Sequence, residues 1–347
     1  MEPMTVDSGT RILLGLCASV LVAAAMQAGQ SVFAPIVFAL FVIALVWPVQ
    51  RAVQARIPAG LALIGTILVA CAVVAVMVFA IAWAFGRVAQ WVIANAGQFQ
   101  ALYAAKVAWL ESRGVEGAGL LAEQFDSRWM VRVAQGVLAQ LQGVVSFVVV
   151  TAVFVILGLL EVGQVGSQLD RMTGKPAAQR VLAGLAASAS KLRVYMWVRT
   201  IASGLTGVLV WAFARYMGLD LAAEWGVIAF VLNYIPFIGP LIATVFPTAV
   251  GLLQFGSWQA VVTIFAALQV IQFLIGSYLE PRLTGNYLAV SPFMVLVAVF
   301  LGAFLWGMPG AFIGVPVLIV ALTLCEQFEG GRWVADLLSG RAAPDGR

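Results

Sequence analysis

Two kinds of residue are scarce in this sequence: charged residues and histidine. Only 10% of the 347 residues are charged and 63% are hydrophobic, whereas soluble domains carry about 25% charged residues. The mean hydropathy is +1.03. This composition excludes a soluble protein and predicts an all-α, polytopic transmembrane helical bundle.

The absent residue types also restrict the chemistry. Histidine is missing altogether, which excludes catalytic triads, histidine zinc sites and histidine proton relays. Cys17, Cys71 and Cys325 lie in apolar runs without metal-binding or disulfide spacing. No G-x-x-x-x-G-K-[ST] loop occurs, so direct drive by ATP is unsupported. We therefore expect no enzyme activity, no cofactor, no metal site and no nucleic-acid partner.

Long stretches without charge indicate the membrane segments. A helix needs about 20 apolar residues to cross a hydrocarbon core of about 30 Å, so the longest charge-free runs must divide. We predict about eight spans, with discontinuous or re-entrant helices in the C-terminal half, over these segments: 12–27, 32–47, 59–85, 142–160, 200–218, 225–255, 258–279 and 291–325. The first two segments are compatible with a tight hairpin or with two full crossings.

The segment 87–141, between the third and fourth spans, has apolar residues at helical spacing on both sides of a turn at Gly114–Gly119. It predicts two amphipathic helices. These helices either lie on the membrane surface or against neighbouring subunits, or form a small water-exposed cap over the bundle.

The distribution of Lys and Arg gives the expected orientation. The linker 48–58 and the basic amphipathic segment 161–199 read as cytoplasmic, which puts 87–141 outside. Both termini are then expected in the cytoplasm. The predicted domains, in order, are an N-terminal helix pair with its linker (1–58), a span pair with external helices (59–160), a cytoplasmic segment (161–199), a transport core (200–325) and a tail (326–347).

Two proline- and glycine-rich motifs predict broken helices at membrane depth. Asn233-Tyr234-Ile-Pro236-Phe-Ile-Gly239-Pro240 and Trp306-Gly307-Met-Pro309-Gly310, the latter followed by Pro316, lie in charge-free runs. Proline removes a backbone donor, and lipid offers no water to replace it, so such breaks persist only beside protein or a watery cavity. The alternative is that these residues merely kink long helices. We expect a true discontinuity at residues 233–240 and a hinge at Gly307, Pro309, Gly310 and Pro316.

Polar side chains near the first break are the candidate binding residues. Uncharged amides and hydroxyls bind cargo or join helices with equal ease, and Asn233 is favoured for binding because it adjoins the break. The predicted substrate site comprises Asn233, Tyr234, Pro236, Gly239, Pro240, Thr244, Gln269 and Gln272. Glu280 and Arg282 form the only charged pair between Glu224 and Glu326. They are explained by a mutual ion pair, by ion coupling, or by snorkelling at the membrane edge.

These motifs resemble those of the autoinducer-2 exporter family of bacterial membrane proteins. The resemblance lies in Leu232 to Ala243, Leu279 to Gly285, Leu288 to Pro292 and Pro309 to Pro316. It implies about eight spans, an inner-membrane location and an elevator-like transport domain. It also implies a homo-oligomer, for which a pentamer is one expected form. Members have been assigned either autoinducer-2 export or sodium–proton exchange.

The sequence thus predicts a secondary transporter that exports a small polar solute by alternating access around residues 225–255. An uncharged cavity of amides, hydroxyls and exposed backbone suits a neutral, polyol-like solute, and the resemblance suggests autoinducer-2. The alternatives are a sodium or lithium/proton antiporter, for which Glu280 is the one candidate carboxylate, and a membrane scaffold without transport.

Overall fold

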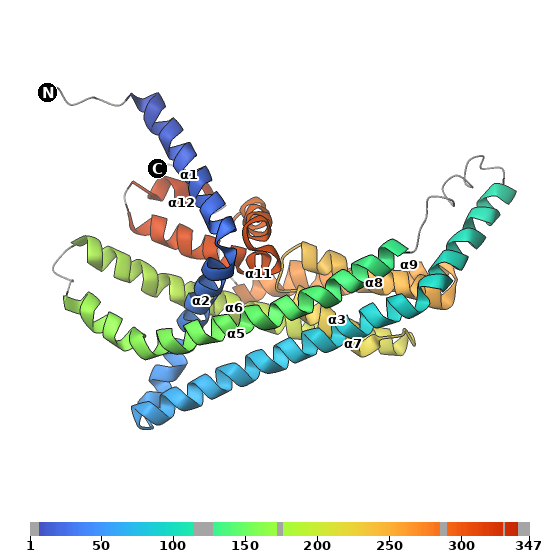
Figure 1. The fold of residues 1–347 in the computed structure, drawn as a ribbon, viewed down its shortest axis with the longest axis horizontal. Coiled ribbons are helices and arrows are strands. Elements are labelled where there is room, and N and C mark those ends of the chain that lie inside the picture. Colours follow the sequence, from blue (N-terminus) through green and yellow to red (C-terminus); the bar gives the residue numbers. More distant parts are fainter. Residues whose placement is uncertain (1–6, 114–127, 172–175, 285–289, 329, 339–347) are drawn as a thin grey trace. The chain divides into compact units, whose positions relative to one another are not determined.

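The structure is a computed structural model that describes residues 7–113, 128–171, 176–284, 290–328 and 330–338. The elements described are all helices (Figure 1). They are α1 (Ser8–Ala28), α2 (Gln30–Gln54), α3 (Ala59–Ser112), α5 (Arg128–Arg171), α6 (Pro176–Tyr216), α7 (Ala222–Leu232), α8 (Ile238–Phe255), α9 (Trp258–Phe273), the π-helix η1 (Leu274–Leu279), α10 (Glu280–Thr284), α11 (Pro292–Gln327) and α12 (Arg332–Leu338).

Seven of the described helices are long and apolar enough to cross a membrane, and two shorter apolar helices accompany them, Leu13–Ala28 and Ala222–Leu232. The prediction of an all-α polytopic bundle is therefore confirmed. Large apolar side chains such as Leu68, Val76 and Phe79 on α3 are more than half exposed, as expected for a surface that faces lipid.

The chain forms two compact units, each built from separate stretches. One unit contains Met1–Ala52, Val150–Leu192 and Ala289–Arg347, and the other contains Val53–Val149 and Arg193–Leu288. The helices α5 and α6 each supply residues to both units.

Helices α1 and α2 do not form the tight hairpin that was one expectation. Only Gly29 separates them, and the N–H groups of Val32 and Phe33 both donate to the Gly29 carbonyl. The helical turn therefore continues past the junction, and α2 leads away from α1 (Figure 1). One non-helical residue is too few to reverse a helix, so the Gln27–Ser31 cluster produces a kink instead.

Three predicted segments are parts of longer helices. The span 59–85 continues through the first external amphipathic stretch as α3, and the span 142–160 lies inside α5. The described parts of the cytoplasmic segment 161–199 belong to the end of α5 and to the start of α6, and α6 continues into the span 200–218. At these borders the charge-free, apolar sequence ends because the helix leaves the membrane, but no proline lies there to end the helix itself. The predicted turn at Gly114–Gly119 lies outside the described residues.

The region 225–255 is a helical hairpin, here called the first hairpin: α7, a tip at residues 233–237, and α8. Gln254, at the far end of α8, accepts a hydrogen bond from the Asp220 N–H at 2.8 Å and donates to the Gly218 carbonyl at 2.7 Å. Because both residues precede α7, the two arms begin and end at the same level. At 11 residues, α7 is about 16 Å long, too short to cross a bilayer.

Helix α11 is also a hairpin, here called the second hairpin. Its backbone leaves the helical path at Trp306 and at Gly307, where φ is 64°. A methyl group on Gly302 would overlap the Gly310 carbonyl, and one on Gly314 would overlap the Ala298 carbonyl. Pairs equidistant from the turn thus touch, and the arms are antiparallel. The predicted discontinuities are confirmed at both sites.

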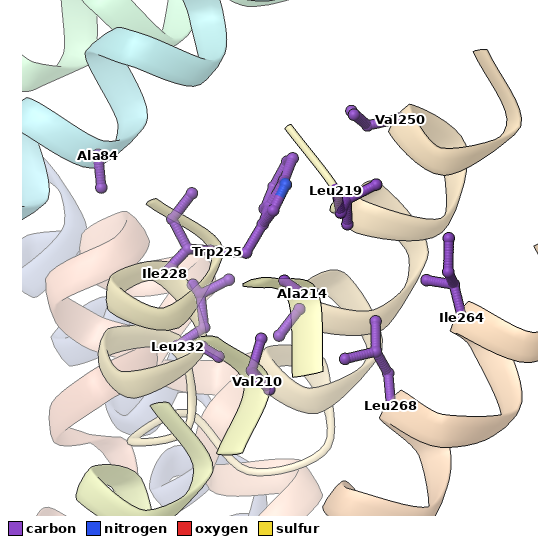
Figure 2. Close-up of a cluster of buried hydrophobic side chains, with 12 residues drawn as sticks. Ala84, Val210, Ala214, Leu219, Trp225, Ile228, Leu232, Val250, Ile264 and Leu268 are labelled. Atoms are coloured by element: carbon purple, nitrogen blue, oxygen red, sulfur yellow. The ribbon is translucent and has the colours of Figure 1, made fainter. Parts of the chain in front are cut away.

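A hydrophobic core holds the first hairpin in its unit (Figure 2). Trp225 is 2% exposed and packs with residues of α3, α6, α8 and α9. Helices α6 and α7 cross closely, since a Cβ on Gly207 would lie 2.8 Å from the Gly226 carbonyl oxygen. Small residues permit such close packing in membranes. This crossing fixes where the tip of the hairpin meets α6.

Candidate functional site

The tip of the first hairpin is shaped by its prolines and glycine. Pro236 has no N–H to offer the Leu232 carbonyl, so the helix cannot continue, and Phe237 adopts a positive φ of 63°. The chain becomes helical again at Ile238, and Pro240 lies in the first turn of α8, where a missing N–H costs little. A methyl group on Gly239 would overlap the Leu232 carbonyl. These residues set the backbone path of the tip and have no polar side-chain atoms. The polar side chains of the tip are those of Asn233 and Tyr234.

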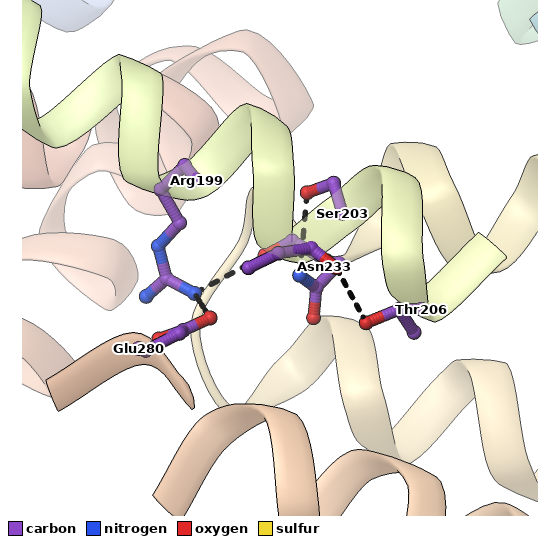
Figure 3. A network of polar contacts seen from close by, with 6 residues as sticks. Arg199, Ser203, Thr206, Asn233 and Glu280 are labelled. Atoms are coloured by element: carbon purple, nitrogen blue, oxygen red, sulfur yellow. Dashed lines mark hydrogen bonds and ion pairs between the residues drawn. The ribbon is translucent and has the colours of Figure 1, made fainter. Parts of the chain in front are cut away.

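Asn233 and Tyr234 both bind α6, and Figure 3 shows the contact that Asn233 makes. The Asn233 amide donates to the Ser203 hydroxyl at 3.2 Å, and the Tyr234 hydroxyl donates to the Thr200 hydroxyl at 3.0 Å. Asn233 is 4% exposed and Ser203 is fully buried. Buried polar groups of this kind are stable only when paired, so the tip is held against one face of α6.

Arg199, one turn before Ser203, brings a charge to the same place. One guanidinium nitrogen donates to the Glu280 carboxylate at 2.7 Å and to the Asn233 carbonyl at 3.4 Å. The guanidinium carbon also lies 5.8 Å from the centroid of the Tyr195 ring, within the range of a cation–π contact. The side chains of Arg199 and Glu280 are 14% and 19% exposed.

A π-helix presents Glu280 to Arg199. The π-helix η1 (Leu274–Leu279) ends immediately before Glu280, which opens α10. A π-helical turn changes the direction in which the following side chains point, and such turns are frequent at functional sites. Arg199, Thr200, Ser203, Asn233, Tyr234 and Glu280 are together called the tip cluster below.

The structure thus unites three of the predicted site residues, Asn233, Tyr234 and Glu280, with three that sequence reasoning missed. Arg199, Thr200 and Ser203 escaped notice because Arg199 was counted with the basic cytoplasmic segment, and hydroxyls are common in apolar helices. The available signal was that Arg199 is the last charge before the run 200–214.

Other predicted residues lie outside the tip cluster. Thr244 is buried in α8 and donates to the Pro240 carbonyl of its own helix at 2.9 Å. Gln269 is exposed on α9, and Gln272 is partly buried there. Arg282 is exposed, and Arg199 is the ion-pair partner that the structure shows for Glu280.

The predicted hinge residues belong to the second hairpin. Gly307 makes the turn, Pro309 lies in the turn that follows, and Gly310 and Pro316 are buried inside the second arm. The turn is fixed to the end of α1: the Trp306 indole donates to the Met26 carbonyl at 3.1 Å, and the Gln27 amide donates to the Phe304 carbonyl at 3.3 Å.

The tip cluster can recognise a polar molecule without bearing net charge. It offers a guanidinium and a carboxylate that neutralise each other, an amide and three hydroxyls. Among the described residues there is no group of three His, Cys, Asp or Glu that would hold a metal ion. The chemistry of the cluster is hydrogen bonding at a broken helix, which is the usual construction of a transporter binding site.

Seven of the described helices are long and apolar enough to cross a membrane, as in a multi-span membrane protein. The comparisons with known proteins identify a transport protein rather than an enzyme. Residues 13–330 match the family model described as "AI-2E family transporter", and the chain belongs to this family. It is 27% identical over 343 residues to "AI-2 transport protein TqsA" of Escherichia coli (strain K12), covering 97% of this chain and 98% of that protein.

Two further relatives carry broader names. "Putative transport protein YhhT" of Escherichia coli (strain K12) is 30% identical over 227 residues, which are 65% of this chain and 64% of that protein. "Putative transport protein" of Borreliella burgdorferi is 31% identical over 186 residues, 53% of this chain and 51% of that protein. A membrane transporter acts on a solute and resides in a lipid bilayer, and both statements hold for this chain.

Proposed function

We propose that the protein is a secondary transporter of the bacterial inner membrane that exports a small polar solute by alternating access, with elevator-like movement of its transport core (200–325). The observation that carries this proposal is the tip cluster, where a broken helix presents an amide, hydroxyls and a neutralised ion pair inside an apolar unit. The predicted substrate site, Asn233 to Pro240 with Thr244, Gln269 and Gln272, remains part of the proposal.

The proposed solute is neutral and rich in hydroxyl groups. A strongly charged solute would have to separate Arg199 from Glu280, which bind each other at 2.7 Å, whereas a neutral one can exchange hydrogen bonds with the amide and hydroxyls. Autoinducer-2 is the first candidate, because a relative that aligns with 97% of the chain is named for its transport.

Sodium or lithium/proton exchange is the second candidate. The observation that favours it is the Glu280 carboxylate, whose side chain is 19% exposed and which lies within the membrane-length helical stretch Trp258–Leu283. Carboxylates in such positions carry protons in many transporters. The close contact with Arg199 argues against it, because the guanidinium occupies the place that an exchanged cation would need.

The assembly and orientation are also proposals. We propose a homo-oligomer, with a pentamer as the form to test by native mass spectrometry, and both termini in the cytoplasm. For the carboxyl terminus the two hairpins support this, since each returns to the side it entered from and, among the described residues between Gly256 and the second hairpin, α9 is the crossing. The amino terminus needs its own test, because α1 and α2 do not fold back on each other.

The function is tested with purified protein in proteoliposomes. Autoinducer-2 and a panel of neutral, anionic and cationic small solutes are offered with and without imposed proton and sodium gradients. We expect flux of a neutral, polyol-like solute. Asn233→Ala should reduce this flux at least tenfold while insertion stays normal, because it removes an amide from the proposed site.

Thr248→Ala is the matched control, since the Thr248 hydroxyl binds only the Thr244 carbonyl within α8. Wild-type flux in Asn233→Ala would remove Asn233 from the site, and no flux of any solute in the wild-type protein would favour the scaffold alternative. For the antiport candidate, Glu280→Gln should abolish sodium-driven proton movement; unchanged movement would exclude Glu280 as the exchanger.

A further inference from the structure

At the carbonyl end of α7, the N–H groups of Tyr234 and Ile235 donate to the Val231 and Leu232 carbonyls, and a side chain donates to the next carbonyl, that of Asn233. The last carbonyls of a helix lack helical donors and carry partial negative charge. At the end of α7, the chain leaves the helical path at residues 233–237. The Asn233 carbonyl therefore needs a donor from elsewhere, and it receives one from Arg199 at 3.4 Å.

The same guanidinium nitrogen also binds Glu280. Arg199 therefore joins three elements of one unit: α6, on which it lies, the tip of the first hairpin, and α10 behind the π-helix. The Tyr195 ring, one turn earlier on α6, lies against the guanidinium with 5.8 Å to the ring centroid. Each of the three partners limits where the guanidinium can be.

Two neutral hydrogen bonds also join the tip to α6, from Asn233 to Ser203 and from Tyr234 to Thr200. A hydrogen bond from a charged donor contributes roughly twice as much as a neutral one. The single bond from Arg199 to the Asn233 carbonyl is therefore comparable to the two neutral bonds together, and it is the charged attachment of the tip.

We propose that Arg199 is a positioning residue that clamps the hairpin tip to α6, and that Glu280 holds Arg199 in the clamping position. On this account the charge of Glu280 acts on the hairpin through Arg199, and Glu280 is not itself an ion carrier. The inference deepens the proposed transport function, because it names the contact that must loosen for the hairpin to move; its structural test does not depend on any solute.

The test measures the distance between the first hairpin and α6. Spin labels are placed by Leu241→Cys on α8 and Val208→Cys on α6, both exposed positions, after Cys17, Cys71 and Cys325 are replaced by serine. Double electron–electron resonance on the protein in nanodiscs gives the distribution of distances between the two labels. We expect one narrow distribution in the parent protein, because the tip is docked.

Arg199→Gln should raise the ratio of released to docked hairpin by about tenfold or more, the factor that one hydrogen bond to a charged group supplies. Glu280→Gln should produce the same second population, because Arg199 is then no longer held. Arg215→Gln, an exposed arginine on the same helix, is the matched control and should leave the distribution unchanged. A parent-like distribution in both Arg199→Gln and Glu280→Gln would overturn the proposal.

The charge exchange Arg199→Glu with Glu280→Arg separates a clamp from a simple ion pair. A simple pair would be restored by the exchange. The clamp would not be restored by the exchange, because a carboxylate at position 199 would face the Asn233 carbonyl, and two acceptors repel. A parent-like distribution in the exchanged protein therefore contradicts the clamp. Should Arg199→Gln fail to assemble, Arg199→Lys keeps the charge but loses the planar guanidinium over the Tyr195 ring, and it should show a partly released population.

Flux measured on the same variants distinguishes the two proposals. Released hairpins together with altered maximal flux support both. If the variants release the hairpin but the parent protein moves no solute, the clamp is supported and the transport function is rejected. Lost flux in variants with a docked hairpin supports transport and rejects the clamp.

Discussion

At the scale of single residues, the first hairpin depends on one position without a side chain. Gly239 lies against the Leu232 carbonyl, the last carbonyl of α7. A glycine here allows the second arm to start within van der Waals contact of the first. The conservative-looking change to alanine is therefore predicted to be among the most damaging in the tip.

Gly239→Ala should destabilise the protein by about 1–3 kcal/mol, the usual cost of forcing extra atoms into a packed site. Thermal unfolding in detergent measures this as a lower Tm. The control is Gly204→Ala on α6, where an added Cβ meets no atom within 4 Å; it should leave Tm unchanged or raise it slightly. Equal effects from the two changes would contradict the packing described for the tip.

Substitutions of Asn233 and Ser203 are predicted to have coupled effects on stability. Asn233→Ala and Ser203→Ala each remove the same bond at 3.2 Å, so the double variant should lose less stability than the sum of the single ones. The expected coupling is about 1 kcal/mol, measured from unfolding of all four proteins. Strict additivity would show that the two side chains do not interact.

At the scale of elements, the second hairpin is packed backbone to backbone. Gly302 and Gly310 face each other, and Gly314 faces Ala298. Close approach of small residues is how helices associate in lipid, where the hydrophobic effect gives no preference for contact. Gly310 and Pro316 are therefore parts of a compact pair of arms, in addition to any hinge role.

Gly302→Val should separate the arms and reduce the amount of protein that remains folded after extraction into detergent. The physical reason is that three added carbon atoms would meet the Gly310 carbonyl. Size-exclusion chromatography and a Tm measure the loss. Gly65→Val in α3, where an added Cβ meets no atom within 4 Å, is the control. An intact Gly302→Val protein would contradict the antiparallel packing.

Element types were predictable from the sequence, whereas element lengths were not. Charge-free runs and the Pro-Phe-Ile-Gly-Pro motif located the apolar helices and the first break, because lipid tolerates neither charges nor unpaired backbone. The continuity of α3 past residue 85 was missed, since a helix leaving the bilayer changes its surroundings without changing its backbone. In the site, Asn233 and Glu280 stood out against apolar neighbours, but Arg199 did not, because its partners come from distant segments.

At the scale of the whole molecule, the first hairpin determines the side on which later residues lie. Its base, at Asp220 and Gln254, is closed by hydrogen bonds, and the buried Glu224 beside it binds Arg87 at 3.2 Å. Arg87 belongs to the segment 87–141, which the charge distribution assigns to the outer face. After the hairpin returns there, α9 crosses once, and Arg282 is expected in the cytoplasm.

Single cysteines test this orientation. In the cysteine-free protein, a membrane-impermeant maleimide added to whole cells should label Asp220→Cys and not Arg282→Cys; both positions are exposed. Inside-out vesicles should reverse the result. Labelling of position 282 from outside intact cells would mean that residues 225–255 cross the membrane, against the hairpin.

Helix α3 is long enough to extend beyond the membrane. Its 54 residues amount to roughly 80 Å at 1.5 Å per residue, more than twice the hydrocarbon thickness. The part beyond Arg87 alone accounts for nearly half of that length. The part beyond Arg87 is therefore expected to lie outside the hydrocarbon core, on the side of the membrane from which the first hairpin enters.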